Sequence, residues 1–419
     1  MNQSRLALKN VAGSYISYLS YCIIQEKKGN HLFILPEKEQ ALYFFNDLEN
    51  IFNNERGITL LFYPASYRRP YQIMDADPTS ILQRTAAIDS LDKNRKTQIV
   101  ITYPEAIVEK VIDKKKLKEN IISMAVGEDL ELDFINELLI DLDFEKLDYV
   151  YEPGQFAIRG GIIDVFSYHH EFPYRIELFG DEIDSIREFD PTNQLSKTTL
   201  NRIKIIPNIN NSQFTKNKVS FLEHLPKNTT IWSKDLEVAQ KKMEQGFEIS
   251  TKVYEKIKDK KNVLLPVEMY LSAEDFFTKI KNYFLIEWNR LIDNPQSVKI
   301  NINSEVQPKF NKNFDLLVSS LEEWKSLKYQ IYICSNQESQ LKRLRSIFIE
   351  LEKESLCNFI SIGIHQGFID HNEMLIVFTD HQIFERYHRF QAKKSISKSM
   401  ETFTLKEIYD LQKGDFVVH

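Results

Sequence analysis

Short, almost uninterrupted apolar runs dominate the first part of the chain and restrict its fold more than any other feature. The runs are HLFILP at 31–36, ITLLFYP at 58–64 and QIVITYP at 98–104. Helical patterns separate them, over 37–52 and 79–91. Strands that are apolar on both sides and alternate with helices are typical of a parallel sheet covered by helices on both faces. The sequence therefore predicts an α/β domain.

From about residue 117 the apolar pattern changes to a period of two. Alternating segments joined by tight turns lie at 156–167, 174–179 and 182–189. This alternation is typical of a sheet with one solvated face. We interpret residues 118–202 as a small α+β domain that is inserted into the α/β domain.

The α/β pattern returns after the insertion. A strand is expected at 229–233 and a long helix at 235–257. The simplest interpretation is that 1–117 and 203–300 form the two halves of one α/β domain. Both halves are then expected to contribute to a single core.

The C-terminal part shows a further change of pattern. A polar, proline-containing stretch at 300–308 is interpreted as a linker. Alternating helical and strand patterns then predict a second small α/β domain at 308–390. Lysines, arginines and serines gather at 386–399, which indicates an exposed linker. Residues 391–419 are expected to hold the rest of this linker and a strand-forming end without the remainder of its sheet.

Length, charge and cysteines limit the class of protein. A chain of 419 residues is too long for one ordinary core and predicts several domains. A formal net charge of -6 argues against a protein that holds DNA phosphates along its whole surface. Cys22, Cys334 and Cys357 show no metal-ligand spacing, and no apolar run is long enough to cross a membrane. We expect a cytoplasmic protein without a membrane partner.

A nucleotide site is not predicted. The position most similar to a phosphate-binding loop is 11–16, where Gly13 and Ser14 precede a helical pattern. Such a loop needs a lysine for the phosphates and a hydroxyl for magnesium, but this position has no lysine and no following Ser/Thr pair. We interpret it as a plain helix start capped near Ser14. Asp181 and Glu182 follow an alternating strand and a glycine, so they are interpreted as a hairpin turn.

No catalytic residue, metal site or cofactor is predicted for this chain. Several histidines and aspartates lack a standard metal spacing and are interpreted as solvated or capping side chains: His365, Asp370, His371, Asp380 and His381. The sequence has no Gly-x-Ser-x-Gly elbow and no cysteine in a basic setting. The chain is therefore expected to be a binding module and not an enzyme.

The segment 152–190 contains the most informative pattern. Alternation places Arg175 and Phe179 on the face that should be exposed, and a glycine pair turns the chain just after Arg159. Arginines beside an exposed aromatic ring are frequent in protein interfaces. The alternative is that Phe179 covers a neighbouring helix while Arg175 pairs with Glu177.

The same segment has the sequence EPGQFAIRGGIIDVFSYHHEFPYRIELFGDEIDSIREFD. Its PG-x-F-A-x-RG and PYR-x-x-x-F-G-DEIDSIR-x-FD elements resemble the small inserted domain of UvrB and of the transcription-repair coupling factor family. Residues 379–387, TDHQIFERY, are similar to the end of the third domain of the coupling factors. Residues 411–419 are similar to the opening of their RNA-polymerase-interacting domain.

The resemblance implies the N-terminal, UvrB-like part of a coupling factor, truncated at the start of the polymerase-interacting domain. Such a part has degenerate ATPase motifs, here at Gly13 and Ser14, and docks UvrA through the inserted domain. By motif position the implied UvrA contacts are Arg159, Arg175 and Phe179. The whole protein would be an ATP-dependent DNA translocase that acts on stalled RNA polymerase in nucleotide excision repair. Its polymerase and DNA contacts would lie in C-terminal domains that are missing here.

Two other hypotheses compete with a UvrA-recruiting module. A divergent UvrB-like, nucleotide-dependent repair helicase would be stabilised against heat by ATP, whereas a recruiting module would not. A DNA-binding module would bind duplex DNA with a strong dependence on salt.

Overall fold

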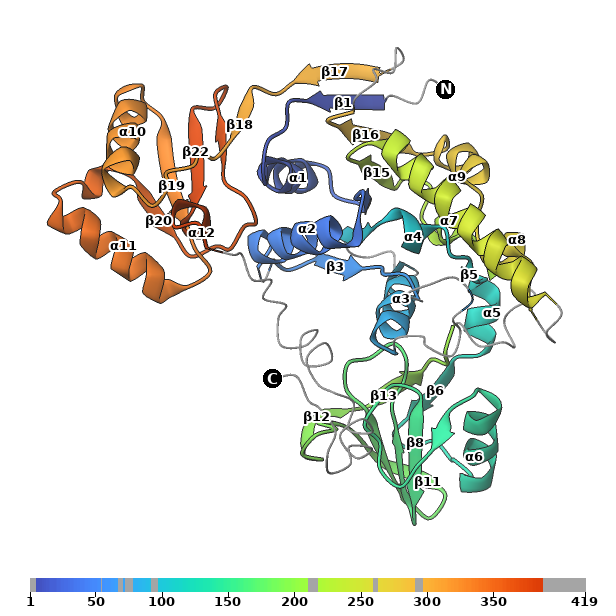
Figure 1. The fold of residues 1–419 in the computed structure, drawn as a ribbon. Coiled ribbons are helices and arrows are strands. Elements are labelled where there is room, and N and C mark those ends of the chain that lie inside the picture. Colours follow the sequence, from blue (N-terminus) through green and yellow to red (C-terminus); the bar gives the residue numbers. More distant parts are fainter. Residues whose placement is uncertain are drawn as a thin grey trace, which may run out of the picture. The chain divides into compact units, whose positions relative to one another are not determined.

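The computed structural model describes residues 5–53, 55–66, 71, 78–91, 97–209, 218–258, 263–290 and 297–386 (Figure 1). The linker expected at 386–399 lies outside this part except for Arg386, and the features expected at 391–419 lie outside it entirely. Within the described residues the fold is α/β, as predicted, with one parallel sheet and further mixed sheets. No described helix is long and apolar enough to cross a membrane.

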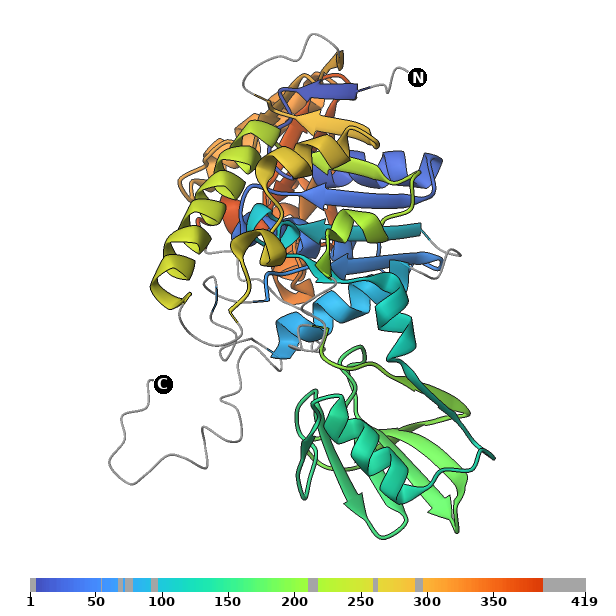
Figure 2. The same ribbon diagram turned by 90° about the vertical axis from the view of Figure 1, so that its right-hand side faces the viewer.

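A seven-stranded sheet has the order β17-β1-β16-β15-β2-β4-β3, and all its neighbouring strands are parallel (Figure 2). In sheet order the strands are β17 (Ser297–Asn301), β1 (Arg5–Lys9), β16 (Phe284–Trp288), β15 (Thr230–Ser233), β2 (Asn30–Ile34), β4 (Thr97–Thr102) and β3 (Ile58–Phe62). Strands from the beginning of the chain therefore share one sheet with strands from 230–301. The strand β1 lies between β16 and β17.

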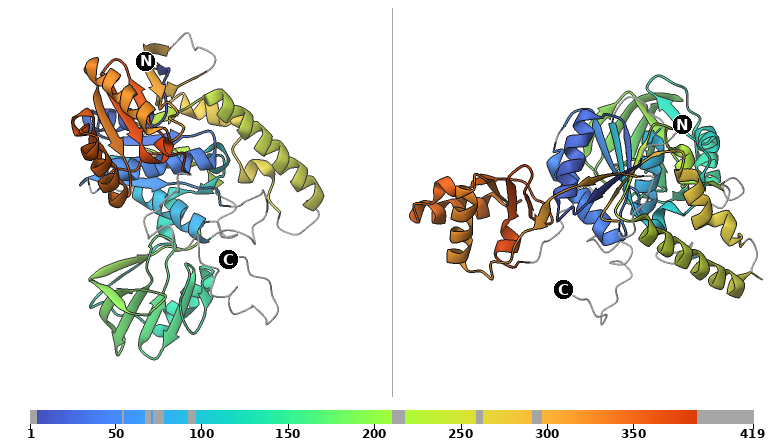
Figure 3. Two further views of the ribbon diagram at one scale, coloured as in Figure 1. Left: turned by 60° about the vertical axis from the view of Figure 1, so that its left-hand side comes forward. Right: turned by 90° about the horizontal axis from the view of Figure 1, so that it is seen from above.

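Helices cover both faces of this sheet, with α1 and α2 on one side and α7 on the other (Figure 3). The helices of this part are α1 (Tyr15–Glu26), α2 (Lys38–Ile51), α3 (Pro78–Leu91), α4 (Pro104–Ile107), η3 (Phe221–His224), α7 (Leu236–Ile257), α8 (Pro266–Met269) and α9 (Ala273–Ile280). Two of the apolar runs predicted as strands, β2 and β4, are buried on both sides, since Leu32, Phe33, Ile99 and Ile101 are all 0 % exposed, whereas the edge strand β3 is only partly buried. Helix α7 begins where Asp235 caps the first turn.

Short elements lead from this sheet to the next one. They are β5 (Val111–Ile112), which pairs with β14 (Lys218–Val219), the helix α5 (Lys114–Glu119), and β6 (Ile122–Ala125), which pairs with β13 (Arg202–Ile205). Both pairs are antiparallel. The chain therefore enters and leaves the region between β6 and β13 through one pair of strands.

That region contains a six-stranded sheet of order β12-β11-β10-β9-β8-β7. Its elements are α6 (Leu132–Asp141), β7 (Glu145–Lys146), β8 (Gln155–Arg159), β9 (Ile162–Val165), β10 (Tyr174–Phe179), β11 (Glu182–Phe189) and β12 (Ser196–Leu200). All neighbours are antiparallel except β7 and β8. The exact domain boundaries given above stay predictions.

A five-stranded sheet of order β18-β21-β22-β19-β20 follows. Its elements are β18 (Ser304–Val306), α10 (Phe314–Ser326), β19 (Gln330–Cys334), α11 (Glu338–Glu350), η4 (Glu354–Leu356), β20 (Asn358–Ile360), β21 (Phe368–Asp370), β22 (Leu375–Thr379) and α12 (Asp380–Ile383). Its core includes the fully buried Leu317, Ile331, Phe348 and Phe378.

The expectation of a linker at 300–308 is wrong. Strand β17 ends at Asn301 and β18 begins at Ser304, so only 302 and 303 lie between two sheets. Both strands are at the edge of their sheets, where backbone hydrogen bonds on one side are enough to hold a strand. A polar, exposed sequence can therefore form a strand here without the apolar pattern that predicts one.

The loop between β20 and β21 contacts helices α1 and α2. The N–H of His365 donates a hydrogen bond of 2.7 Å to the carboxylate of Asp47, and the side-chain amide of Asn50 donates one of 2.8 Å to the carbonyl of Gly363. The ring of His365 stacks on Tyr43, with 3.7 Å between the ring centroids. These contacts join the five-stranded sheet to the helices of the seven-stranded sheet.

The carboxyl group at the centre of this contact is buried. Asp47 is 2 % exposed and also accepts a hydrogen bond of 3.1 Å from the hydroxyl of Ser17. Burial raises the pKa of Asp47 to about 7, although these hydrogen bonds act in the opposite direction. Because this pKa is higher in the folded state than in the unfolded state, the folded state loses stability as the pH rises from about 4 to about 7.

We predict that Asp47→Asn removes this loss of stability with rising pH. An amide can keep both contacts, because its oxygen accepts from His365 and its nitrogen donates to Ser17. The melting temperature of the variant relative to wild type should rise between pH 5 and pH 8, by on the order of a few degrees. Melts followed by circular dichroism across this range measure the difference.

The control for this experiment is Glu39→Gln, an exposed substitution on the same helix. Its effect on the melting temperature should stay constant over the range, since this exposed side chain has no part in the buried contact of Asp47. If the difference in melting temperature between Asp47→Asn and wild type is also constant from pH 5 to pH 8, the prediction is contradicted.

Candidate functional site

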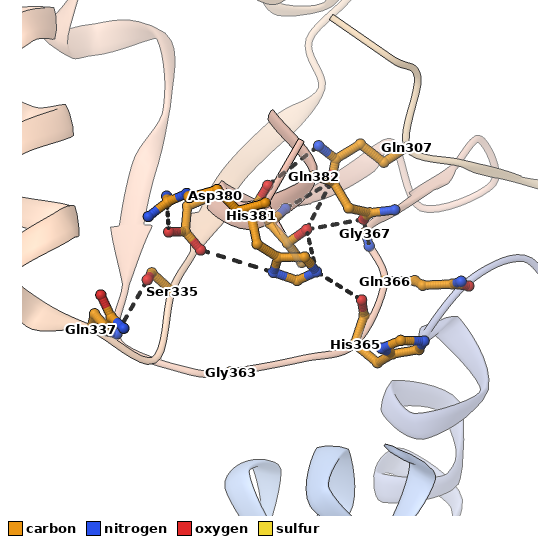
Figure 4. A network of polar contacts seen from close by, with 12 residues as sticks. Gln307, Ser335, Gln337, Gly363, His365, Gln366, Gly367, Asp380, His381 and Gln382 are labelled. Atoms are coloured by element: carbon orange, nitrogen blue, oxygen red, sulfur yellow. Dashed lines mark hydrogen bonds and ion pairs between the residues drawn. The ribbon is translucent and has the colours of Figure 1, made fainter. Parts of the chain in front are cut away.

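The position that resembles a phosphate-binding loop is occupied by the protein's own backbone. The N–H of Ser14 donates a 3.2 Å hydrogen bond to the carbonyl of Gln366, and the N–H of Gln366 donates one of 3.0 Å to the Ser14 hydroxyl. Gly13 has a positive φ of 53°, and a Cβ added there would lie 2.5 Å from the carbonyl oxygen of Gly367. The start of α1 is therefore packed against this loop. In Figure 4, His365 and Gln366 face the helices drawn in blue.

This geometry corrects the expected role of Ser14. It is the residue that precedes the first turn of α1, but its hydroxyl makes no hydrogen bond to the N–H groups of its own helix. The hydroxyl accepts from Gln366 instead. A contact between residues 352 positions apart cannot be predicted from a local capping pattern.

The histidines and aspartates near the C-terminal end each have separate partners. The relevant contacts are His365 with Tyr43, Asp370 with Tyr15, His371 with Tyr329, Asp380 with Arg386, and His381 with the carbonyl of His365. Burial lowers the pKa of His365 to about 4. In the part of the chain that the structure describes, no group of three or more His, Cys, Asp or Glu side chains is placed to hold a metal ion.

One face of the six-stranded sheet gathers charged side chains from neighbouring strands. Asp164 on β9 lies opposite Arg175 on β10, and Arg175 lies opposite Arg187 on β11. Arg159 on β8 and Glu177 on β10 lie in the next row of side chains on the same face of the sheet. We call these five residues the arginine face.

Asp164 is the centre of the arginine face. It is 0 % exposed, and its carboxylate binds two guanidinium groups. It accepts from Arg175 Nε at 2.7 Å and from Arg175 Nη2 at 2.8 Å, and it accepts from Arg159 Nη2 at 2.5 Å. Paired, charge-assisted bonds of this kind fix the plane of a guanidinium group as well as its position.

Arg175 is held more tightly than the sequence predicts. Its side chain is 17 % exposed, it also donates to Gln194, and it lies over the ring of the fully buried Phe189 at 4.4 Å. The hydrogen bonds that Arg175 donates to Asp164 raise the pKa of Arg175 above its ordinary value. The expectation that Arg175 lies on a freely exposed face is therefore wrong, and so is its alternative pairing, since Glu177 binds Arg187 of β11.

Arg159 lies at the outer end of β8 and is more accessible. Its side chain is 35 % exposed. Besides Asp164, it donates to the backbone carbonyl of Asp148 and lies over the ring of Tyr149, 5.0 Å from the ring centroid. The guanidinium group is thus oriented from three sides while part of it faces solvent.

Phe179 is the most exposed large apolar residue of the part described, at 83 %. It ends β10, and Gly180 with a φ of 65° turns the chain into β11. The β10–β11 register shifts between Glu177 and Leu178, which lies just before this turn. The alternative that Phe179 covers a neighbouring helix is therefore wrong.

These side chains lie on strands that are anchored by apolar packing. Val150, Ala157, Phe166 and Phe189 form a buried cluster, in which Ala157 lies opposite Asp164, and Leu82 of α3 packs against it. An exposed aromatic ring on the same sheet as partly exposed, oriented arginines is suited to binding another protein. It offers no nucleophile or acid–base pair of its own.

Residues that sequence reasoning missed include Asp164, Gln194 and Tyr149. A signal was present for Asp164, because IIDV places one aspartate in an otherwise apolar strand. A buried charge in such a strand requires a charged partner. Gln194 and Tyr149 lie in connecting segments that have no alternation to indicate their direction.

Comparison with known proteins links this surface to a family model. Residues 122–210 match the model described as the UvrB interaction domain. This stretch includes the whole six-stranded sheet and therefore the arginine face and Phe179.

The full chain is similar to curated transcription-repair-coupling factors. It is 23 % identical to that of Bacillus subtilis, over 98 % of this chain and 41 % of the relative. It is also 23 % identical to that of Borreliella burgdorferi (99 % and 39 %) and 22 % identical to that of Staphylococcus aureus strain bovine RF122 (93 % and 38 %). The chain thus spans about two fifths of the length of these relatives. The arginine face accordingly lies in a match to the UvrB interaction domain, within a chain that is similar to the N-terminal part of the transcription-repair-coupling factors.

Proposed function

We propose that this chain is a non-catalytic, cytoplasmic module that recruits UvrA and so links stalled RNA polymerase to nucleotide excision repair. The observation that carries the proposal is the exposed Phe179 on the same sheet as two oriented arginines, inside the stretch that matches the UvrB interaction domain. We propose Arg159, Arg175 and Phe179 as the docking surface for UvrA.

The chemistry of this surface supports a protein partner. Exposed aromatic rings and arginines supply a large share of the binding free energy in protein interfaces. Asp164 balances only one of the two positive charges that it binds, so Arg159 and Arg175 together leave a surplus of about one positive charge. A carboxylate on the partner would complement that surplus.

Partners of the whole protein belong to the same proposal. The relatives are more than twice as long as this chain and bear the name transcription-repair-coupling factor. We propose that RNA polymerase, DNA and ATP-driven translocation involve the parts of such a protein that this chain does not match. No cofactor is proposed for the chain itself.

The first prediction of the proposed function concerns the binding of nucleotide. We expect no binding of ATP with magnesium, because the start of α1 has no lysine and is packed against Gln366 and Gly367. The melting temperature should not change in millimolar ATP. A micromolar site would add about 4 kcal/mol at that concentration and would be obvious in the melt. Such a shift would favour the alternative, a divergent UvrB-like nucleotide-dependent helicase; UvrB serves as the positive control.

The second prediction concerns docking. Phe179→Ala should lower the affinity for UvrA about thirtyfold, which corresponds to ~2 kcal/mol, because the ring is exposed and free to enter a partner pocket. The melting temperature should match wild type. Titration calorimetry with UvrA and circular-dichroism melts measure the two effects.

Phe134→Ala is the matched control for docking, since Phe134 is an exposed phenylalanine of the same region but lies on helix α6. It should keep both affinity and stability. Equal affinities for wild type, Phe179→Ala and Arg159→Ala would end the assignment of this surface.

The third prediction concerns stability. Arg175→Ala should destabilise the protein by about 3 kcal/mol, because it leaves the buried carboxylate of Asp164 with one guanidinium partner. Adding Asp164→Asn to this variant should restore part of the loss, since a neutral amide is easier to bury than a carboxylate that has lost two of its three charged hydrogen bonds. Urea unfolding of wild type, single and double variants measures the effect. Wild-type stability for Arg175→Ala would mean that the ion pair is not needed for the fold.

A further inference from the structure

Tyr149 lies on the surface directly beside the arginine face. Its side chain is 51 % exposed, and the guanidinium group of Arg159 is 5.0 Å from its ring centroid. The attraction between a cation and an aromatic ring is weak when both are exposed and becomes stronger when water is excluded. A partner that covers the ring would therefore strengthen this contact.

The segment that carries Tyr149 is held in place by its neighbours. The side-chain oxygen of Gln155 accepts hydrogen bonds from the backbone N–H groups of Tyr151 and Glu152, both at 2.9 Å. On the other side, the N–H of Leu147 donates to the carbonyl of Phe156 at 2.9 Å. Val150, which directly follows Tyr149, is 0 % exposed and belongs to the buried cluster with Ala157, Phe166 and Phe189. The ring of Tyr149 is thus attached to a fixed backbone.

The two arginines of the docking surface are built in the same way. Each shares the carboxylate of Asp164 and lies over one aromatic ring, Phe189 for Arg175 and Tyr149 for Arg159. Phe189 is 0 % exposed, whereas about half of Tyr149 is open to solvent. The ring beside Arg175 is therefore already shielded from solvent by the protein itself. The ring beside Arg159 is shielded only when a partner covers Tyr149.

We propose that Tyr149 positions Arg159 for docking and extends the UvrA-binding surface onto the segment between β7 and β8. This inference rests on the proposed function. Holding a guanidinium group in its bound orientation before contact reduces the rotational freedom that binding has to remove. The ring itself supplies an apolar area next to a positive charge, which suits an acidic or amide side chain flanked by apolar ones.

The test compares Tyr149→Ala, Tyr149→Phe and Tyr151→Ala in the full chain. Tyr151 is the matched control, because it is an exposed tyrosine of the same segment, 40 % exposed, two residues further along. Titration calorimetry with UvrA should show an affinity about tenfold lower for Tyr149→Ala, and changes within about twofold for Tyr149→Phe and Tyr151→Ala. Retained affinity in Tyr149→Ala would overturn the inference.

Positioning is distinguished from a separate contact by a double variant. If Tyr149 acts in part through Arg159, the variant with both Tyr149→Ala and Arg159→Ala should lose less affinity for UvrA than the sum of the two single losses. Fully additive losses would overturn the positioning role. The Arg159 side-chain Nε–H resonance should also shift in Tyr149→Ala without any partner present, because the ring current is lost, and an unchanged resonance would count against the inference.

The outcomes separate this inference from the proposed function. If Phe179→Ala and Arg159→Ala both keep wild-type affinity for UvrA, the docking surface itself is misplaced. If they lose affinity while Tyr149→Ala keeps it, only the role of Tyr149 is wrong.

Discussion

A carboxylate that is buried within a sheet must be neutralised by its neighbours, and the proposed docking surface depends on how Asp164 meets this requirement. It binds Arg175 through two hydrogen bonds and Arg159 through a third. Because the aspartate has no access to solvent, the loss of either guanidinium group leaves a buried carboxylate with fewer charged hydrogen-bond donors. The interaction that stabilises this sheet therefore also sets the direction of the side chains that we propose to bind UvrA, and stability and recognition cannot be separated at Arg175.

Backbone contacts have a similar double role at the start of α1. A glycine followed by a helix is typical of a phosphate-binding loop. Here, however, the backbone of Gln366 is hydrogen-bonded to both the N–H group and the hydroxyl group of Ser14. The same contact connects the five-stranded sheet to helices α1 and α2. A sequence that resembles a ligand site thus forms a contact between two parts of the fold.

Sequence patterns predicted the elements of this fold better than their partners. The apolar runs indicated a parallel sheet, and period-two alternation indicated that Phe179 is exposed. Alternation describes one strand at a time, however, whereas the partner of Arg175 depends on the register of β10 against β9. The nearest acid along the chain, Glu177, was therefore the wrong choice. Strands β17 and β18 were missed for a related reason, since a strand with few apolar side chains is recognisable only by the backbone groups that it pairs with.

The pairing of β6 with β13 has a consequence for forces that act on the docking surface. A domain added at the end of a chain is connected by one strand of polypeptide and can swivel about it. Here two strands run side by side between the seven-stranded sheet and the six-stranded sheet, joined by hydrogen bonds from Arg202 to Ile205. Any tension applied at the far sheet is divided between both covalent paths. Twisting one sheet against the other deforms the pair of strands as a ribbon, so the connection is stiffer against rotation than a single tether of the same length.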